Sequence, residues 1–326
     1  MENYKELLVS NKMKIGVWGT GYIGISTMVY FAKQGVSCLG TDISKSTVDT
    51  INSGELHIKD LKDWFGFEIK SLVENNFLRA TTDFNELISS EVLVHFIAIP
   101  TEKDGEPYFN ILEEVINKIS KTKTLGMNPP PLVIVESTLT PKTSENIIIP
   151  LFTKNGIKIG EDILYSVAPR RDWFVEGNKS LKELDRVFGG TDSYTSEITR
   201  DVLSIVCDKV HISSSHRVSE MVKSVENAYR HMEITLANQL SLEGNDIAII
   251  PLMCIMCVAI PFVLITLAPR YITAAEVNLF FLLETILGPL WVWLVIKEQP
   301  SFETIVGGSI IVVTIAIHSF LALRKA

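Results

Sequence analysis

Residues 13–24 read MKIGVWGTGYIG, and a second apolar run, VSCLGTD at 36–42, follows them and ends on Asp42. A short β-rich run that passes at once into glycines and then into a helical pattern, here from about Tyr22, is typical of a strand, a tight turn and a helix. A further helical pattern begins at about Ser46. Together these segments predict a βαβ unit, and with it an α/β fold.

The rest of the front half repeats this alternation of apolar runs and helical segments. Later runs with the composition of buried strands lie at 92–99, 132–137, 163–167, 186–188 and 209–212. Strands that are apolar along nearly their whole length need helices on both faces of their sheet. The sequence therefore predicts a Rossmann-like, doubly wound parallel sheet over residues 1–212.

A long helix is predicted after the sheet. Apolar residues recur at three- and four-residue steps from Ser214 to about Glu243, as they do along one face of a helix. We assign residues 213–246 to this central helix. Its regular apolar face predicts a packing partner.

Charge separates the chain into two parts. The chain has 30 Lys+Arg against 38 Asp+Glu, a net charge of −8, and residues 247–326 are neutral on balance. The acidic front has no basic run long enough to follow a phosphate backbone, which excludes a nucleic-acid partner. The segment 1–12 has no apolar core like that of a signal peptide, and the cysteines show no disulfide spacing, so we expect the front to be cytoplasmic.

Three apolar spans, at 247–268, 277–296 and 304–323, dominate the rest of the chain. Each has about 20 residues, the length that crosses a ~30 Å hydrocarbon layer. They predict a membrane domain at 247–326 and an integral inner or plasma membrane location. The alternative is three buried core helices of a soluble protein.

The glycine loop also carries chemistry. After a strand and before a helix, its backbone N–H groups and the positive helix end can hold a pyrophosphate; the residues are Gly19, Gly21, Tyr22, Ile23 and Gly24. Asp42 closes the second strand, where a carboxylate accepts hydrogen bonds from both ribose hydroxyls and repels a 2′-phosphate. The cofactor predicted by this pair of features is NAD rather than NADP.

Five motifs occur in a fixed order: KIGVWGTGYIG (14–24), AIPT (98–101), EST (136–138), DWFVEG (172–177) and EMVKSVENA (220–228). With them, residues 13–243 resemble the UDP-glucose/GDP-mannose dehydrogenase family. These enzymes oxidise a nucleotide sugar at C6 to the uronic acid. The resemblance implies NAD as cofactor, a UDP-sugar as substrate and a homodimer formed through the long helix.

The resemblance also assigns roles to residues. Pro100 and Thr101 would line the cofactor, and Thr138 would lie near the nicotinamide and a catalytic water. The same pocket would contain Asp172, at a position where the family more often has Glu, and Glu176.

Lys223 and Asn227 lie four residues apart on one helical face. Their ammonium and amide groups would converge on an oxygen that becomes negative during hydride transfer. The alternative is a solvated helix face. Arg170 and Arg171 precede Asp172, and either contact a phosphate or a sugar carboxylate, or are solvated.

One family feature is missing from the sequence. Family enzymes complete a second oxidation on a Cys in a Gly-rich loop downstream of the long helix, and this chain has no such loop. Its cysteines are Cys38, Cys207, Cys254 and Cys257. The six histidines are scattered without paired ligand spacing, so no metal site is predicted.

Residues 252–323 resemble the closing helices of EamA-type drug/metabolite transporters. The motifs that carry this resemblance are AlaProArgTyr at 268–271, Leu283-Glu284, Lys297-Glu298 and Val306-Gly307-Gly308. Three hypotheses follow. The leading one is an NAD-dependent nucleotide-sugar 6-dehydrogenase-like oxidoreductase fused to a membrane anchor. The others are a transporter-related membrane protein with an NAD-sensing domain, and a non-functional fusion of two partial proteins.

Overall fold

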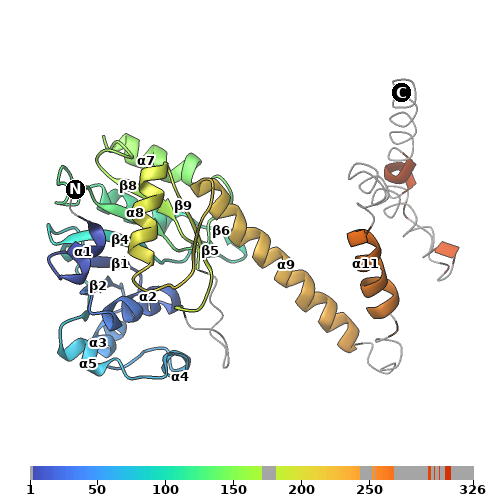
Figure 1. Ribbon diagram of the computed structural model, residues 1–326, viewed down its shortest axis with the longest axis horizontal. Helices are drawn as coiled ribbons and strands as arrows, with labels where there is room; N and C mark the ends of the chain where they lie inside the picture. The colour runs from blue at the N-terminus through green and yellow to red at the C-terminus, as the bar shows by residue number, and fades with distance from the viewer. Residues whose placement is uncertain are drawn as a thin grey trace. The chain divides into compact units, whose positions relative to one another are not determined.

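A computed structural model describes residues 3–170, 181–242, 252, 254–267, 293–294, 297, 301 and 305–309. The chain forms two compact units, Met1–Glu233 and Ile234–Ala326. The first unit is an α/β domain in which helices cover both faces of a central sheet (Figure 1).

Eight strands form the sheet, in the order β10-β9-β8-β7-β4-β1-β2-β3. The strands are β1 (Lys14–Trp18), β2 (Cys38–Thr41), β3 (Leu78–Thr81), β4 (Val92–Ile97), β7 (Leu132–Val135), β8 (Leu164–Val167), β9 (Arg186–Gly190) and β10 (Val210–Ile212). A separate antiparallel hairpin joins β5 (Glu102–Lys103) to β6 (Glu106–Pro107). The order changes direction between β1 and β4, which is the switch point of a doubly wound sheet.

The doubly wound sheet is confirmed, with two differences from the prediction. All pairs from β3 to β8 are parallel, but β9 pairs antiparallel with β8, so the prediction of a wholly parallel sheet is wrong at that edge. A parallel neighbour needs a long crossover, usually a helix, and the described parts of this connection, 168–170 and 181–185, contain none. The edge strand β3 was not predicted, because it is only four residues long and contains the exposed Arg79.

Ahead of residue 216, the described residues of the first unit form ten helical elements around the sheet. They are α1 (Tyr4–Val9), α2 (Tyr22–Lys33), α3 (Lys45–Asn52), α4 (Asp60–Phe65), α5 (Lys70–Glu74), η1 (Phe84–Glu86), α6 (Asn110–Ile119), η2 (Ser144–Ile148), α7 (Ile149–Lys154) and α8 (Ser193–Leu203). Side-chain caps fix several starts: Ser44 accepts from Thr47 N at 3.3 Å, and Asp192 from Thr195 N at 2.7 Å. The α1 start is capped in the same way by Asn3, ahead of the first predicted strand.

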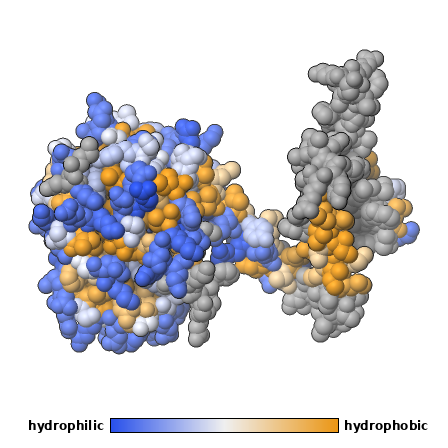
Figure 2. Space-filling view, viewed as in Figure 1, coloured by the Kyte–Doolittle hydropathy of each residue, from blue (hydrophilic) through white to orange (hydrophobic). Residues whose placement is uncertain are grey.

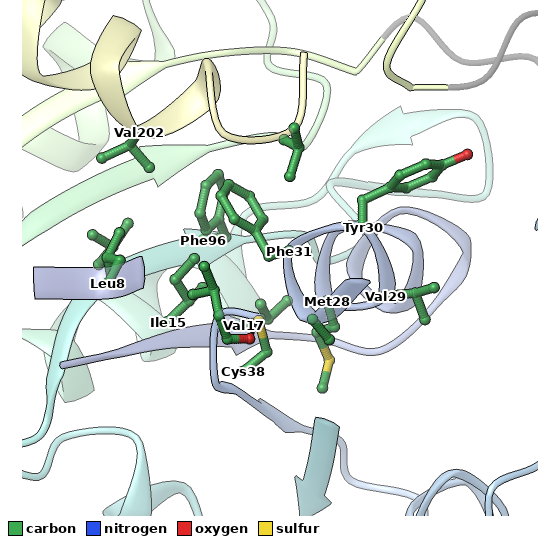
Figure 3. Close-up of a cluster of buried hydrophobic side chains, with 14 of the residues drawn as sticks. Leu8, Ile15, Val17, Met28, Val29, Tyr30, Phe31, Cys38, Phe96 and Val202 are labelled. Carbon is green, nitrogen blue, oxygen red and sulfur yellow. Dashed lines mark hydrogen bonds between the residues drawn. The ribbon is translucent and has the colours of Figure 1, made fainter. Parts of the chain in front are cut away.

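Alternating strand residues supply two cores, one on each face of the sheet. On β7, Leu132 and Ile134 belong to the core covered by α1, α2 and α8, which Figure 3 shows in part, while Val133 and Val135 belong to the core covered by α6 and α7. This period of two is the pattern of a sheet buried on both sides. The two cores therefore hold the strand ends, and the loops that follow them, in fixed positions.

The long predicted helix is present as α9 (His216–Leu242). One of its faces exposes large apolar side chains, at Val218, Met221, Val225, Tyr229 and Met232. The opposite face of its first turns is buried, with Ser219 and Glu220 at 0% and 1% exposure. The helix therefore contacts the α/β domain on one face and leaves an apolar face uncovered.

The second unit is described only in part, by η3 (Cys254–Ala259), α11 (Ile260–Leu267) and short pieces. Its described side chains are mainly hydrophobic (orange in Figure 2). No helix among the described residues is both long and apolar enough to cross a bilayer. The predicted spans 277–296 and 304–323 lie mostly outside the described residues, so the membrane domain and the anchor remain predictions without support.

A buried histidine makes the free energy of unfolding depend on pH. His95, on β4, is fully buried; its Nδ1 accepts from Trp18 Nε1 at 3.4 Å, and its Nε2 has no hydrogen-bond partner among the described residues. Burial penalises the charged imidazolium and lowers the pKa of His95 to about 3. The folded state therefore holds this side chain neutral.

The first prediction concerns acid stability. Between pH 6.5 and 3 the unfolded chain binds a proton at His95 that the folded chain does not, so the free energy of unfolding falls as the pH drops through this window. The contribution of one such group is about 1.4 kcal/mol per pH unit. We expect His95→Leu to remove this part of the slope between pH 6.5 and 5, measured by urea unfolding. The exposed His211→Gln is the control, and an unchanged slope in His95→Leu would contradict the prediction.

Candidate functional site

A cleft of about 760 Å³ opens at the carboxyl ends of β1, β2, β4 and β7, beside the switch point of the sheet. This is where ligands bind in open α/β sheets, and the volume suits a small-molecule site. Most predicted site residues line it: Gly19, Gly21, Tyr22, Ile23, Asp42, Pro100, Thr101, Thr138 and Lys223. Sequence positions more than 200 residues apart thus share one cleft.

The glycine loop joins β1 to α2. Two of its glycines are packed too closely against backbone atoms to carry a side chain, whereas Gly21 faces open space. Gly19 has φ +90°, and a Cβ there would lie 2.5 Å from Ala98 O; a Cβ at Gly24 would lie 1.8 Å from Gly19 O. A Cβ at Gly21 would meet nothing within 4 Å. Gly21 precedes α2 without a side-chain cap, so the first N–H groups of the helix remain available for an anion. This cradle fits a diphosphate.

Asp42 follows β2, and two backbone N–H groups and one hydroxyl fix its carboxylate. Its Oδ2 accepts from Thr20 N at 3.2 Å and from Thr20 Oγ1 at 2.7 Å, and its Oδ1 accepts from Ser44 N at 2.9 Å. A carboxylate has about four acceptor positions, and these donors occupy three of them, so Oδ1 can accept one further hydrogen bond from a ribose hydroxyl. Asp42 thus stands in the cleft as a fixed anion, which fits the predicted ribose role. The anchoring role of the fully buried Thr20 was not predicted, because no local pattern indicates it.

The turns after β4 and β7 are joined by side chains. Ser137 Oγ donates to Ile99 O at 2.8 Å and accepts from Ile99 N at 2.9 Å. Thr101 Oγ1 donates to Thr138 O at 2.5 Å. Pro100, Thr101 and Thr138 all line the cleft, and their expected roles toward the cofactor, the nicotinamide and a catalytic water remain predictions.

A buried charge network reaches the cleft, where Glu136 and Arg170 are among the lining residues. Glu136, at the end of β7, is 2% exposed, forms an ion pair with Arg186 and accepts from Thr27 Oγ1 at 2.5 Å. Arg170 Nη1 lies 3.9 Å from Glu136 Oε2 and donates to Thr27 Oγ1 at 2.6 Å. Arg170 is 3% exposed, so the alternative that it is solvated is wrong.

Lys223 and Asn227 differ in their positions. Lys223, on the second turn of α9, lines the cleft together with Thr138, whereas the half-buried Asn227 is not part of the lining. Their joint action on one oxygen remains a prediction. Asp172, Glu176 and Arg171 lie outside the described residues.

Further residues at the cleft were not predicted. Ile43, Thr82 and Phe84 line it beyond Asp42, with Lys118 Nζ 4.0 Å from the Phe84 ring centroid and 2.6 Å from Glu114 Oε1. Single residues between the motifs carry no recognisable pattern, so no signal in the sequence could have identified them.

No cysteine lines the cleft. Cys38 and Cys207 are buried in the core covered by α1, α2 and α8, and burial raises the pKa of the Cys38 thiol, which keeps it neutral. Cys254 and Cys257 are exposed in the second unit. The first unit thus provides a dinucleotide-type cleft with a lysine and a threonine at one end.

Known proteins are similar to this chain in sequence and in fold. The description "UDP-glucose/GDP-mannose dehydrogenase family, NAD binding domain" matches residues 13–206. UDP-N-acetyl-D-mannosamine dehydrogenase from Pyrococcus horikoshii is 30% identical over 238 residues, covering 72% of this chain and 54% of that protein. The enzyme of the same name from Escherichia coli K12 is 32% identical over 241 residues, 71% of this chain and 55% of its own.

Solved structures agree. The NDP-N-acetyl-D-galactosaminuronic acid dehydrogenase from Methanosarcina mazei Go1 superposes with a TM-score of 0.59 and 31% identity, over 74% of this chain and 53% of that one. The chain spans about half the length of the curated relatives it matches. The resemblance of residues 252–323 to EamA-type transporters gains no support from these matches.

The family match covers more than half of the chain and includes the glycine loop, Asp42 and the turns after β4 and β7. The cleft geometry fits the cofactor that the sequence predicted, and NAD is the cofactor of this domain. The chain belongs to the UDP-glucose/GDP-mannose dehydrogenase family.

Proposed function

We propose that this protein oxidises the 6-hydroxyl of a nucleotide sugar, a UDP-sugar in the first instance, to the aldehyde. The observation that carries the proposal is that Lys223 and Thr138 line the same cleft as the glycine loop and Asp42. The similarity to UDP-N-acetyl-D-mannosamine dehydrogenases supports a nucleotide sugar as substrate.

The chemistry needs a hydride acceptor, a proton acceptor and stabilisation of a negative oxygen. Bound NAD supplies the acceptor for the hydride that leaves C6. The hydroxyl proton passes to water held beside Thr138, and the Lys223 ammonium donates a hydrogen bond to the oxygen as negative charge develops on it. Such a preorganised cation stabilises the transition state more than the neutral alcohol.

The second prediction tests this function directly. Purified protein with NAD and a panel of UDP- and GDP-sugars is expected to form NADH, measured by absorbance. Lys223→Ala should lower turnover by about a hundredfold or more, because a charge-stabilising donor is lost, and should leave NAD affinity nearly intact.

The matched control is Lys154→Ala, an exposed lysine at the end of α7 that does not line the cleft. Its turnover should equal that of the unchanged protein. Protein that binds NAD but forms no NADH with any sugar of the panel would refute the proposed function. Equal loss of turnover and NAD affinity in Lys223→Ala would instead mark Lys223 as structural.

The third prediction concerns cofactor preference. Asp42→Asn removes the negative charge but keeps one oxygen for Thr20, so NAD affinity should fall by about tenfold while NADP affinity falls less or rises. Isothermal titration with both cofactors measures the ratio. Asp49→Asn, an exposed acid on α3, is the control. An unchanged NAD to NADP ratio would exclude the ribose role.

We also propose that α9 pairs with α9 of a second copy. Val225 and Tyr229 are 56% and 59% exposed on a face opposite the one that contacts the domain, and the apolar residues of this face recur at three- and four-residue steps. The family resemblance implies the same occupant.

The fourth prediction follows from this pairing. Val225→Asp should convert a dimer to a monomer in light scattering, because it places a charge within the apolar face. His231→Asp, exposed but off this face, should leave the dimer intact. A monomeric unchanged protein, or a dimer that survives Val225→Asp, would refute the pairing.

A further inference from the structure

Glu220 is a fully buried carboxylate that the mechanism above does not use. It lies near the start of α9, on the face that the α/β domain covers, and is 1% exposed. No cation of the described residues forms an ion pair with it. An isolated buried carboxylate is strongly destabilising, so its hydrogen-bond partners must account for its presence.

Three donors from one turn hold this carboxylate. Lys142 N donates to Oε2 at 2.9 Å, Ser144 N donates to Oε1 at 2.8 Å, and Ser144 Oγ donates to Oε1 as well. Tyr165 OH lies 2.5 Å from Ser144 Oγ. Because the Ser144 hydroxyl donates its proton to Glu220, the Tyr165 hydroxyl is the donor in this contact. Ser144 also begins the continuous helix formed by η2 and α7, whose positive end favours an anion.

These donors belong to the segment that continues from the cleft wall. Thr138 lines the cleft, and residues 139–144 lead from it to the Glu220 contacts. A second tie joins the same segments, because Ser224 Oγ donates to Leu139 O at 3.3 Å. Lys223 therefore lies between two attachments of α9 to the Thr138 segment.

Helix geometry makes this attachment specific for Lys223. Lys223 is three residues beyond Glu220, about 4.5 Å along the axis and on the same side of the helix. A rotation or axial shift of the first turns of α9 would move the Lys223 ammonium relative to Thr138 by a similar amount. Hydride-transfer geometry tolerates little displacement, and about 1 Å can cost a hundredfold in rate.

We propose that Glu220 is a positioning residue that holds Lys223 beside Thr138 by tying α9 to the turn at Lys142 and Ser144. This inference rests on the proposed function, in which Lys223 acts on the sugar oxygen. A merely structural carboxylate would affect folding and cofactor binding together. A positioning carboxylate affects turnover and the environment of Lys223 while NAD binding is preserved.

The test uses Glu220→Gln, which keeps the shape of the side chain but turns one acceptor into a donor facing a donor. We expect turnover to fall by about tenfold to a hundredfold, with NAD affinity changed by less than about twofold. Glu220→Asp, which retains the charge, should recover part of the loss. Glu145→Gln is the matched control, because it removes the ion pair with Arg217 between the same two segments but not the carboxylate network.

A second readout does not depend on turnover. The rate at which a lysine-selective acylating reagent modifies Lys223, measured by mass spectrometry, should change in Glu220→Gln and stay constant in Glu145→Gln, with Lys154 as internal reference. If the unchanged protein forms no NADH with any nucleotide sugar, the proposed function fails, and this readout alone decides the role of Glu220.

Ser144→Ala provides a milder variant should Glu220→Gln not fold. It removes the hydroxyl donor and leaves both backbone donors, so we expect a smaller change of turnover and of Lys223 modification in the same direction. Unchanged turnover and unchanged Lys223 modification in the folded variants would overturn the proposal. Parallel loss of NAD affinity and thermal stability would also overturn it, because Glu220 would then be structural only.

Discussion

The buried carboxylate of Glu136 is the interaction on which the arrangement of the site depends. At the end of β7 it is almost fully buried, and a charge in that position is tolerated only if cations and hydrogen bonds surround it. Arg186 comes from β9, which pairs antiparallel with β8, Arg170 from the segment after β8, and Thr27 from α2. One carboxylate thus fixes the helix that follows the glycine loop relative to the far half of the sheet.

The residues that follow Glu136 extend this connection along the chain. Ser137 holds the turn after β4, Thr138 accepts from Thr101, and Leu139 accepts from α9. The next turn then binds Glu220. These contacts reach two further elements, the turn after β4 and α9, so a single segment, 136–144, connects the cofactor loop, the cleft wall and the lysine-bearing helix. Such convergence places the functional groups on rigid elements rather than on a mobile loop.

The sequence predicted those features that depend on local patterns. The strands, the glycine turn and the long helix each have a periodicity or a φ requirement that is visible within a few residues, and Asp42 has a fixed distance from the loop. Contacts between distant segments have no such signal: nothing near Glu220 indicates Ser144, and nothing near Arg186 indicates Glu136. The antiparallel β9 was missed for the same reason, since a short apolar run such as 186–188 does not encode its direction.

Arg170 shows how far a local interpretation can mislead. Two consecutive arginines in a net acidic chain suggest a solvated or phosphate-binding pair, because isolated arginines are rarely buried. The structure buries Arg170 through donors to Thr27 and Ser26 and proximity to Glu136. Only the arrangement of three separate elements makes that burial favourable, and that arrangement is a property of the whole fold.

The charges that line the cleft explain how a net acidic chain can bind an anionic cofactor. The chain carries a net charge of −8, yet its cofactor contains an anionic diphosphate. Surface charges farther away than about 8 Å are largely screened at physiological ionic strength, so the local groups decide. At the glycine loop these are the uncapped N–H groups of α2. Asp42 and Lys223 line the same cleft, and in the proposed function they would disfavour an additional phosphate and supply a cation beside the reacting oxygen. Because these groups are set by the backbone of β1, β2 and α9, the acidic surface can vary without changing what the cleft binds.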